Sequence, residues 1–418
     1  MSLAQTNAGT RRLAQGEADV LISAHERFLA GRPGGRRANL RFVDFSGLDL
    51  AGRNLSDADF TGAAFDNCRM VKIRLERAIL FGCSLQKADL RGAVLARADL
   101  RGVRLRGANL AYSDLTQADF REGQILIPHP SKGLQAARPE SRNGDLDEAN
   151  FSGATLDGSN FTGASAFAAD FSDCSLKGAK LTGANLKDAN LSGALMEGAV
   201  VAGANLQGVN LQGAVVSGVE LTAARGLIAP PPSCLVSPTA EAAARSEEFM
   251  ALIEGNKDWC LTGGKRGSPA HLDNQDLRPL ADALKGAWLT AMSARGACLV
   301  GMDLSSAQLQ GANFEGADLR GVSFLGADLR GARLTGANLT KVDLRQATLG
   351  PLPLPGGRLN PAHLGGARLR YISAVVADFT GAVFDNADLR CADFTGAKFA
   401  GASLRGADLT DVVGLELR

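Results

Sequence analysis

From position 38 to position 122 the chain carries an apolar residue at every fifth position, beginning at Leu40 and ending at Phe120. All seventeen of these positions hold Leu, Phe or Met, and a small residue, most often Ala, usually stands two positions earlier. A period of five matches neither the 3.6-residue repeat of a helix nor the alternation of a strand. It fits a coil in which short extended segments form flat sides and turns form the corners, with the apolar centres pointing inward.

The same pattern returns twice, with fifteen centres from Phe151 to Leu221 and a third array from Leu284 to Leu409. Many units place Gly two positions after the centre, as in Thr61-Gly62, where a corner can use the positive φ that Gly accepts. From these arrays we predict a core that includes Leu40, Phe45, Phe60, Phe65, Leu90, Leu100, Leu110, Phe151, Phe171, Leu186, Leu206, Leu304, Phe314, Leu329, Phe379 and Phe399.

Units such as Ala58-Asp59-Phe60-Thr61-Gly62 and Ala108-Asn109-Leu110 resemble the A(D/N)Lxx motif of the pentapeptide-repeat family. The resemblance implies an all-β fold, namely a right-handed quadrilateral parallel β-helix, a solenoid with four units in each coil of twenty residues, here with short helical caps. Stacked coils would pair their backbones about 4.8 Å apart, as strands do. The resemblance implies little about function, because the family includes proteins of several roles.

The breaks between arrays predict the domain organisation. The expected parts are, in order, a disordered N-terminus at 1–16, a first β-helix module at 17–223 with a helical cap at 17–30 and a projecting loop at 123–144, a linker and helix at 224–257, and a second β-helix module at 258–418. The segment from Gly350 to Leu364 contains several Pro residues but keeps the five-residue phase, so we expect it to remain in the coil with irregular pairing.

A short motif suggests that the cap occurs twice. Leu252-Ile253 followed by Trp259 lies 231 residues after Leu21-Ile22 followed by Phe28. We interpret this as a second copy of the helical cap, which would make the chain two solenoid modules. The alternative is a long insertion inside one continuous helix, with a chance similarity of short motifs.

The sequence contains no convergent set of chemical groups. Its four His have no partners at ligand or triad spacing, there is no Cys-x-x-Cys, and residues 263–268 lack the spacing of a phosphate-binding loop. We therefore predict no catalytic, metal or cofactor site and no enzyme activity. The N-terminus lacks an apolar signal region, and no apolar stretch is long enough to span a membrane. Scattered Cys residues that replace Ala in the repeat favour free thiols and a cytoplasmic protein.

Candidate interaction residues come from the charged faces and the loop. Residues twenty apart should stack, which would put Arg101 beside Arg121 and would put Arg330, Arg370 and Arg390 on one face, interrupted by Gly350. His129 and Lys132 lie in the predicted loop. The stacked arginines could bind phosphate or an acidic surface. The alternative is solvated charge interleaved with Asp.

We expect a non-catalytic scaffold that binds an unidentified protein through its coil faces and projecting loops. A second hypothesis follows from the resemblance, because some family members mimic DNA and bind DNA gyrase, a type II topoisomerase. Such mimicry needs a strongly acidic surface, whereas this chain has a net charge of +1. A third is nucleic-acid binding through Arg ladders, which the low aromatic content does not favour. An uncovered last coil could also pair with a second copy, giving a homodimer.

Overall fold

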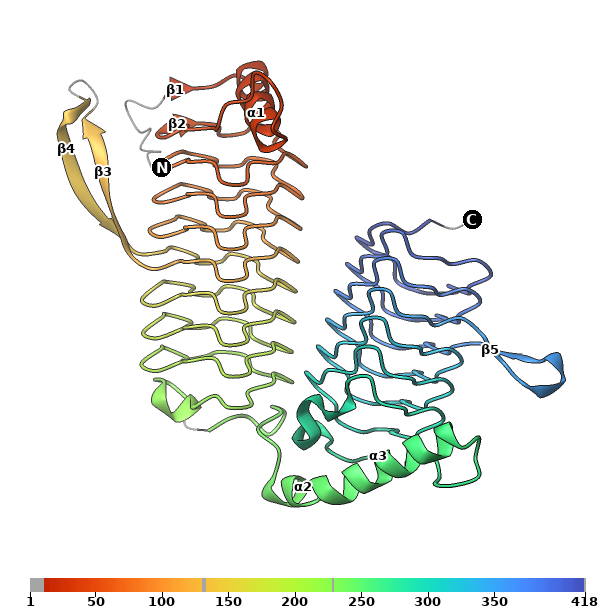
Figure 1. Ribbon diagram of the computed structural model, residues 1–418. Coiled ribbons are helices and arrows are strands. Elements are labelled where there is room, and N and C mark those ends of the chain that lie inside the picture. The colour runs from red at the N-terminus through yellow and green to blue at the C-terminus, as the bar shows by residue number, and fades with distance from the viewer. Residues whose placement is uncertain (1–10, 130–132, 228, 417–418) are drawn as a thin grey trace. The chain divides into compact units, whose positions relative to one another are not determined.

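Residues 11–129, 133–227 and 229–416 are described by the computed structural model of the chain (Figure 1). They belong to two compact units, Met1–Ser237 and Pro238–Arg418. The helix expected within the linker therefore belongs to the second unit.

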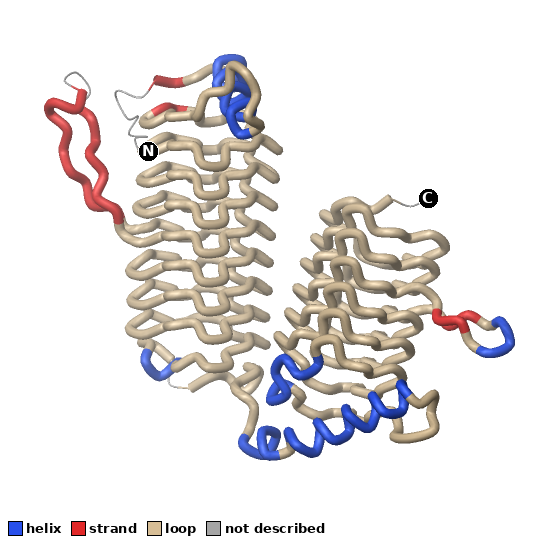
Figure 2. Tube along the Cα trace, viewed as in Figure 1, coloured by secondary structure: helices blue, strands red, loops and turns tan. Residues whose placement is uncertain are grey.

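In both units the backbone winds into coils of twenty residues that are joined by parallel β-bridges. Arg69 shows the pattern, since Leu50 N–H donates to its carbonyl at 2.7 Å and its own N–H donates to the Leu48 carbonyl at 3.0 Å. One coil meets the next through four bridges, one on each side: Asn39 with Asp59, Asp44 with Ala64, Asp49 with Arg69, and Asn54 with Arg74. Each bridge is a single residue pair, so the coils are drawn as loops in Figure 2.

The corners lie two positions after each apolar centre and have positive φ. Gly62 has φ of 69°, and Asn67 at the next corner has φ of 59°. Gly reaches this region without steric cost, and Asn tolerates it better than most residues. The five-residue period thus sets one extended side and one corner per unit.

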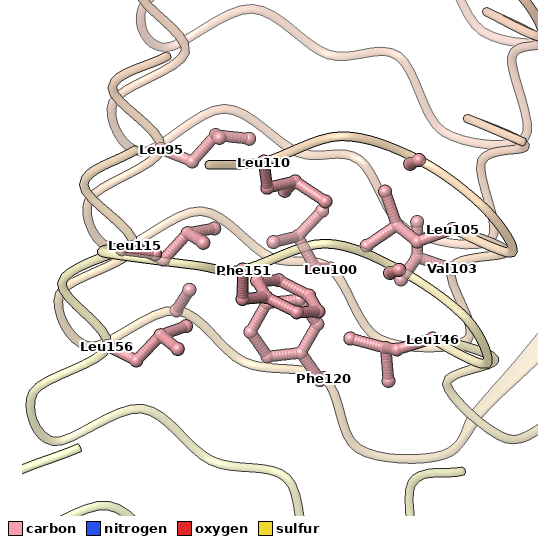
Figure 3. Close-up of a cluster of buried hydrophobic side chains, with 14 of the residues drawn as sticks. Leu95, Leu100, Val103, Leu105, Leu110, Leu115, Phe120, Leu146, Phe151 and Leu156 are labelled. Atoms are coloured by element: carbon pink, nitrogen blue, oxygen red, sulfur yellow. The ribbon is translucent and has the colours of Figure 1, made fainter. Parts of the chain in front are cut away.

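The apolar centres fill the interior of each coil. Figure 3 shows this packing around Phe120 and Phe151, whose rings meet edge-to-face with centroids 6.3 Å apart. Phe45, Phe60 and Phe65 make a second aromatic group, with the rings of Phe45 and Phe65 stacked at 4.9 Å. Of the sixteen core residues expected from the sequence, fifteen are buried. Leu40 is half-buried and packs against the core of the first unit.

A helix and a short strand pair cover the first coil of the first unit. The helix α1, Gln15–Leu29, buries Ala18 and Ile22 against the coil, and β1, Arg11–Arg12, pairs in parallel with β2, Val43–Asp44. The expectation of disorder over 1–16 is therefore wrong from Arg11 onward, because β1 and α1 lie there. Residues 1–10 lie outside the described residues.

The second unit begins with helices at the corresponding place. They are α2, Ala240–Ala244, and α3, Ser246–Leu261, which extends beyond the helix expected from the sequence. A 3₁₀ segment η1, Leu221–Ala223, lies at the end of the first unit, and another, η2, Arg278–Leu284, lies in the first coil of the second.

The segment expected as a projecting loop at 123–144 is a β-hairpin. Strand β3, Gly123–His129, pairs antiparallel with β4, Gly133–Arg142 (Figures 1 and 2). The coil continues across it without a gap, since Arg104 bridges directly to Asp145.

The expectation that Gly350–Leu364 stays in the coil is wrong. Strands β5, Leu352–Pro353, and β6, Leu359–Asn360, form a second antiparallel hairpin, with the 3₁₀ turn η3, Pro355–Gly357, at its tip. Arg333 bridges to His363, thirty residues on, so ten residues leave the coil. Ten residues make two whole units, which is why the phase of the apolar positions did not reveal the insertion.

Candidate interaction surfaces

The β5–β6 hairpin is fixed at its base and exposed at its tip. At the base, the Asn360 amide donates to the Gly331 carbonyl at 3.1 Å, and Leu352 packs so closely on Gly331 that a Cβ there would lie 2.7 Å from the Leu352 Cβ. Beyond the base, Leu354 next to η3 is 38% exposed and Leu359 in β6 is 64% exposed. Both leucines occupy the phase of repeat centres, yet the coil does not use them.

The β3–β4 hairpin is also anchored on a coil face. Ile125 is 3% exposed and lies against two corner glycines, where its Cδ1 would be 2.5 Å from a Cβ placed on Gly82. Arg142 donates to the Gly82 carbonyl at 2.9 Å and pairs with Glu140 at 2.7 Å. Of the two loop residues singled out from the sequence, His129 lies in β3, and Lys132 lies outside the described residues.

Arg101 and Arg121 are neighbours in one column, as expected from the twenty-residue spacing. Gly102 N–H donates to the Arg121 carbonyl at 2.9 Å. Each guanidinium binds the Asp two residues earlier through two nitrogens, Arg101 with Asp99 and Arg121 with Asp119. Each positive charge therefore has a carboxylate beside it within its own repeat unit.

The expected common face for Arg330, Arg370 and Arg390 is not formed. Tyr371 N–H donates to the Arg390 carbonyl, which places Arg370 and Arg390 in one column. In the coil that follows Arg330, Gly350 occupies the position stacked on Arg330. The β5–β6 insertion then shifts the spacing between stacked residues by ten, so Arg330 lies in a different column from Arg370 and Arg390.

These arginines too have carboxylate partners. Arg330 binds Asp328, and Asp388 receives hydrogen bonds from both Arg390 and Arg370. Burial acts against ionisation of Asp388, but its hydrogen bonds to Arg390 and Arg370 outweigh that effect and lower its pKa to about 2. The alternative considered from the sequence, charge interleaved with Asp, describes these columns.

The buried thiols of Cys68 and Cys83 are not activated nucleophiles. Burial raises the pKa of Cys68 to about 12, and it also raises the pKa of Cys83. Among the described residues, no three His, Cys, Asp or Glu side chains gather as a metal site, and no helix there is both long and apolar enough to cross a membrane. An open pocket of about 400 Å³ at the end of the first unit, whose lining includes Val216, Val219 and Leu221, was not foreseen from the sequence.

Together these observations define a protein built from five-residue units, with coils that carry anchored hairpins. The family model for pentapeptide repeats matches eight copies, which cover more than half of the chain: 36–70, 58–97, 83–122, 145–183, 184–222, 293–324, 315–350 and 377–413. The chain belongs to the pentapeptide repeat family. Membership implies a right-handed β-helix solenoid. Comparison with curated proteins gives no match.

Several solved structures are similar to the chain over part or most of its length. A pentapeptide repeat protein from the Arabidopsis thaliana thylakoid lumen is 29% identical over 32% of this chain and 72% of its own, with a TM-score of 0.22. A trypsin-treated variant of QnrB1, a plasmid-mediated fluoroquinolone resistance protein, is 14% identical over 50% of this chain and 95% of its own, with a TM-score of 0.25. HetL, involved in heterocyst differentiation regulation in the cyanobacterium Nostoc, is 20% identical over 93% of both chains, with a TM-score of 0.11.

Proposed function

We propose that the chain is a non-catalytic cytoplasmic scaffold that binds a protein partner through its hairpins, each carried by a quadrilateral β-helix. The observation that carries this proposal is the exposure of Leu354 and Leu359 on a hairpin across which the coil continues, since Arg333 bridges directly to His363. Every other Leu or Phe centre between Leu284 and Phe399 is buried. Burying what is still exposed would yield about 1–2 kcal/mol for Leu359, which is 64% exposed, and about 0.5–1 kcal/mol for Leu354, which is 38% exposed.

The construction of the β5–β6 hairpin suits binding. Pro353, Pro355 and the two glycines of η3 form a tight tip, and the Leu354 N–H donates to the Arg358 carbonyl at 2.8 Å. A segment that is already ordered loses less conformational entropy when it binds. The two leucines would then enter an apolar cleft on the partner, with the Arg358 guanidinium at its rim in contact with water.

The charge pattern does not support the two nucleic-acid hypotheses. Mimicry of DNA requires a strongly acidic surface, and the net charge is +1. Direct binding requires arginines that can neutralise phosphates, whereas Arg101, Arg121, Arg330 and Arg390 bind carboxylates within their own repeat units.

The proposal can be tested by affinity capture from an extract of the source cells. The baits are the full chain, its Leu359→Ser variant, and a matched control, Val376→Ser, which removes an apolar side chain that is 61% exposed at a corner of the coil. We expect at least tenfold less partner on Leu359→Ser and no change on Val376→Ser. Loss on the control alone would place binding on a coil face, and equal recovery by all three would contradict the hairpin role.

We also propose that the last coils pair two copies of the chain. The N–H groups of Phe384 and Leu389 donate to the next coil, whereas no described residue accepts from those of Leu404 and Leu409. An open edge of this kind can pair with another chain. Sedimentation at micromolar concentration should show a dimer, and Leu409→Asp should give a monomer. A wild-type monomer at that concentration would contradict this proposal.

A further inference from the structure

The two helical caps hold their first coils with the same hydrogen-bond device. In the first unit, His25 Nδ1 accepts from the Ala38 N–H at 3.0 Å, and Nε2 lies 2.9 Å from the Ser56 carbonyl. In the second unit, the Asn256 side-chain oxygen accepts from the Ala270 N–H at 2.8 Å, and its nitrogen donates to the Thr290 carbonyl at 3.1 Å. His25 and Asn256 are both fully buried.

The two caps share a second contact. Gly35 packs on the last turn of α1, where a Cβ would lie 2.4 Å from the Phe28 nitrogen, and Gly267 packs on α3, where a Cβ would lie 2.0 Å from the Gly255 carbonyl oxygen. The caps thus use equivalent positions, but the buried bridging residue is a titratable His in the first cap and an amide in the second.

The hydrogen bonds fix the protonation state of His25. Because Nδ1 accepts from a backbone N–H, the proton of the neutral ring must lie on Nε2, from which it donates to Ser56. A second proton on Nδ1 would face the Ala38 N–H, so two donors would meet and the Ala38 amide would lose its partner. An amide side chain has no such second state, and Asn256 keeps its contacts at any pH between 5 and 8.

We propose that the N-terminal cap of the first unit is an acid-sensitive latch, and that the cap of the second unit is its pH-independent counterpart. Protonation of His25 would loosen α1 from the first coil and expose the apolar surface that Ala18 and Ile22 now cover. Acidification would therefore raise the open fraction of the first cap and leave that of the second cap unchanged.

The charged groups around His25 do not stabilise its protonated form enough to cancel the effect of burial, and they do not change charge in the same pH range. Glu26 on α1 and Asp57 on the coil favour the imidazolium, Arg37 opposes it, and burial opposes it most, so the pKa of His25 is lowered from its ordinary value. The pKa values of Glu26 and Asp57 are also lowered, because their hydrogen bonds to arginines outweigh any burial, and both stay ionised down to pH 5. Between pH 7.5 and 5, His25 is thus the group in this cluster that changes charge.

The direction of the pH effect follows from linkage. A histidine whose pKa is lower in the closed cap than in the open one gives stability that is complete above the open-state value, near 6.5, and is lost as the pH falls below it. Between pH 7.5 and 5.0 the open fraction can rise by at most about 30-fold, the ratio of proton binding by a free imidazole at the two pH values.

Hydrogen exchange measured by mass spectrometry on the full chain tests the latch, because the chain contains its own control. After correction for intrinsic exchange rates, protection around Ala38 should fall severalfold from pH 7.5 to 5.0, while protection around Ala270 should not. His25→Asn should remove the pH dependence and keep protection at pH 7.5, and Asn256→His should create it around Ala270. Equal pH responses of the two segments in the wild-type chain, or a response that persists in His25→Asn, would overturn the proposal.

Discussion

A chain that lacks residues 123–143 is expected to keep the coils of its first unit. The deletion removes 21 residues and reduces the spacing between Arg104 and Asp145 from 41 to the twenty residues of an uninterrupted coil. Glu122 then occupies a corner, as Lys87 and Arg97 do elsewhere with positive φ. The loss of Ile125 from the coil face should cost about 2 kcal/mol or less.

The matched control is the deletion of residues 123–144, which is one residue longer. Gly144 occupies an inward position where a Cβ would lie 2.3 Å from the Phe120 carbonyl oxygen. Without it, Glu122 is drawn toward that buried position, and an unpaired buried carboxylate costs several kcal/mol. Protection from hydrogen exchange over residues 145–222 should match the wild type in the shorter deletion. In the longer deletion this protection should be lost. Equal protection in both would show that the corner tolerates a missing residue.

The second large effect is expected in the aromatic core. Phe60→Ala should lower the free energy of unfolding of the first unit by about 3–5 kcal/mol, because the cavity lies between rings that cannot collapse into it. Phe60 is fully buried, with its ring centroid 5.1 Å from that of Phe65 and 5.8 Å from that of Phe45. Denaturant unfolding, with exchange over the first unit as the local probe, measures the change.

Two variants calibrate this result. Phe60→Leu keeps a residue type that serves as a centre elsewhere in the repeat, so its cost should be well below that of Phe60→Ala. Leu359→Ala removes a side chain that is already 64% exposed and should change the stability by less than about 0.5 kcal/mol. A Phe60→Ala cost no larger than that of Leu359→Ala would contradict the packing described here.

The regular part of the fold could be read from the sequence because its signal is local and repeated. The residue types within each unit indicate which residue points inward and which forms the corner. Phe45 and Phe379 could therefore both be placed in the core without knowledge of distant contacts. The insertions could not be read in this way. Leu354 and Leu359 keep the five-residue phase, and phase alone does not distinguish a side of the coil from a hairpin of the same length. Pro351 and Pro353, which lack backbone donors, were the available signal.

The candidate site was harder to predict, because the column in which an arginine lies, and the carboxylate that it binds, depend on other parts of the chain. The expectation that Arg330 and Arg390 share a column was wrong because it counted the ten inserted residues as part of the coil. The ion pairs had a visible pattern, an Asp two residues before each of Arg101, Arg121, Arg330 and Arg390. The bridging role of His25 could not be recognised by residue type, since the second cap uses Asn in its place.

The way in which the hairpins leave the coil has a consequence for how such a chain can change over time. Both hairpins leave the coil at a corner and return at the same corner, so the bridges between coils continue regardless of the sequence that is inserted. One hairpin adds 21 residues and the other ten, and only one of these lengths is a multiple of five. Any peptide whose ends can meet at a corner could therefore be spliced in there. The coil can acquire, exchange or lose such segments, natural or engineered, while its own sequence stays the same.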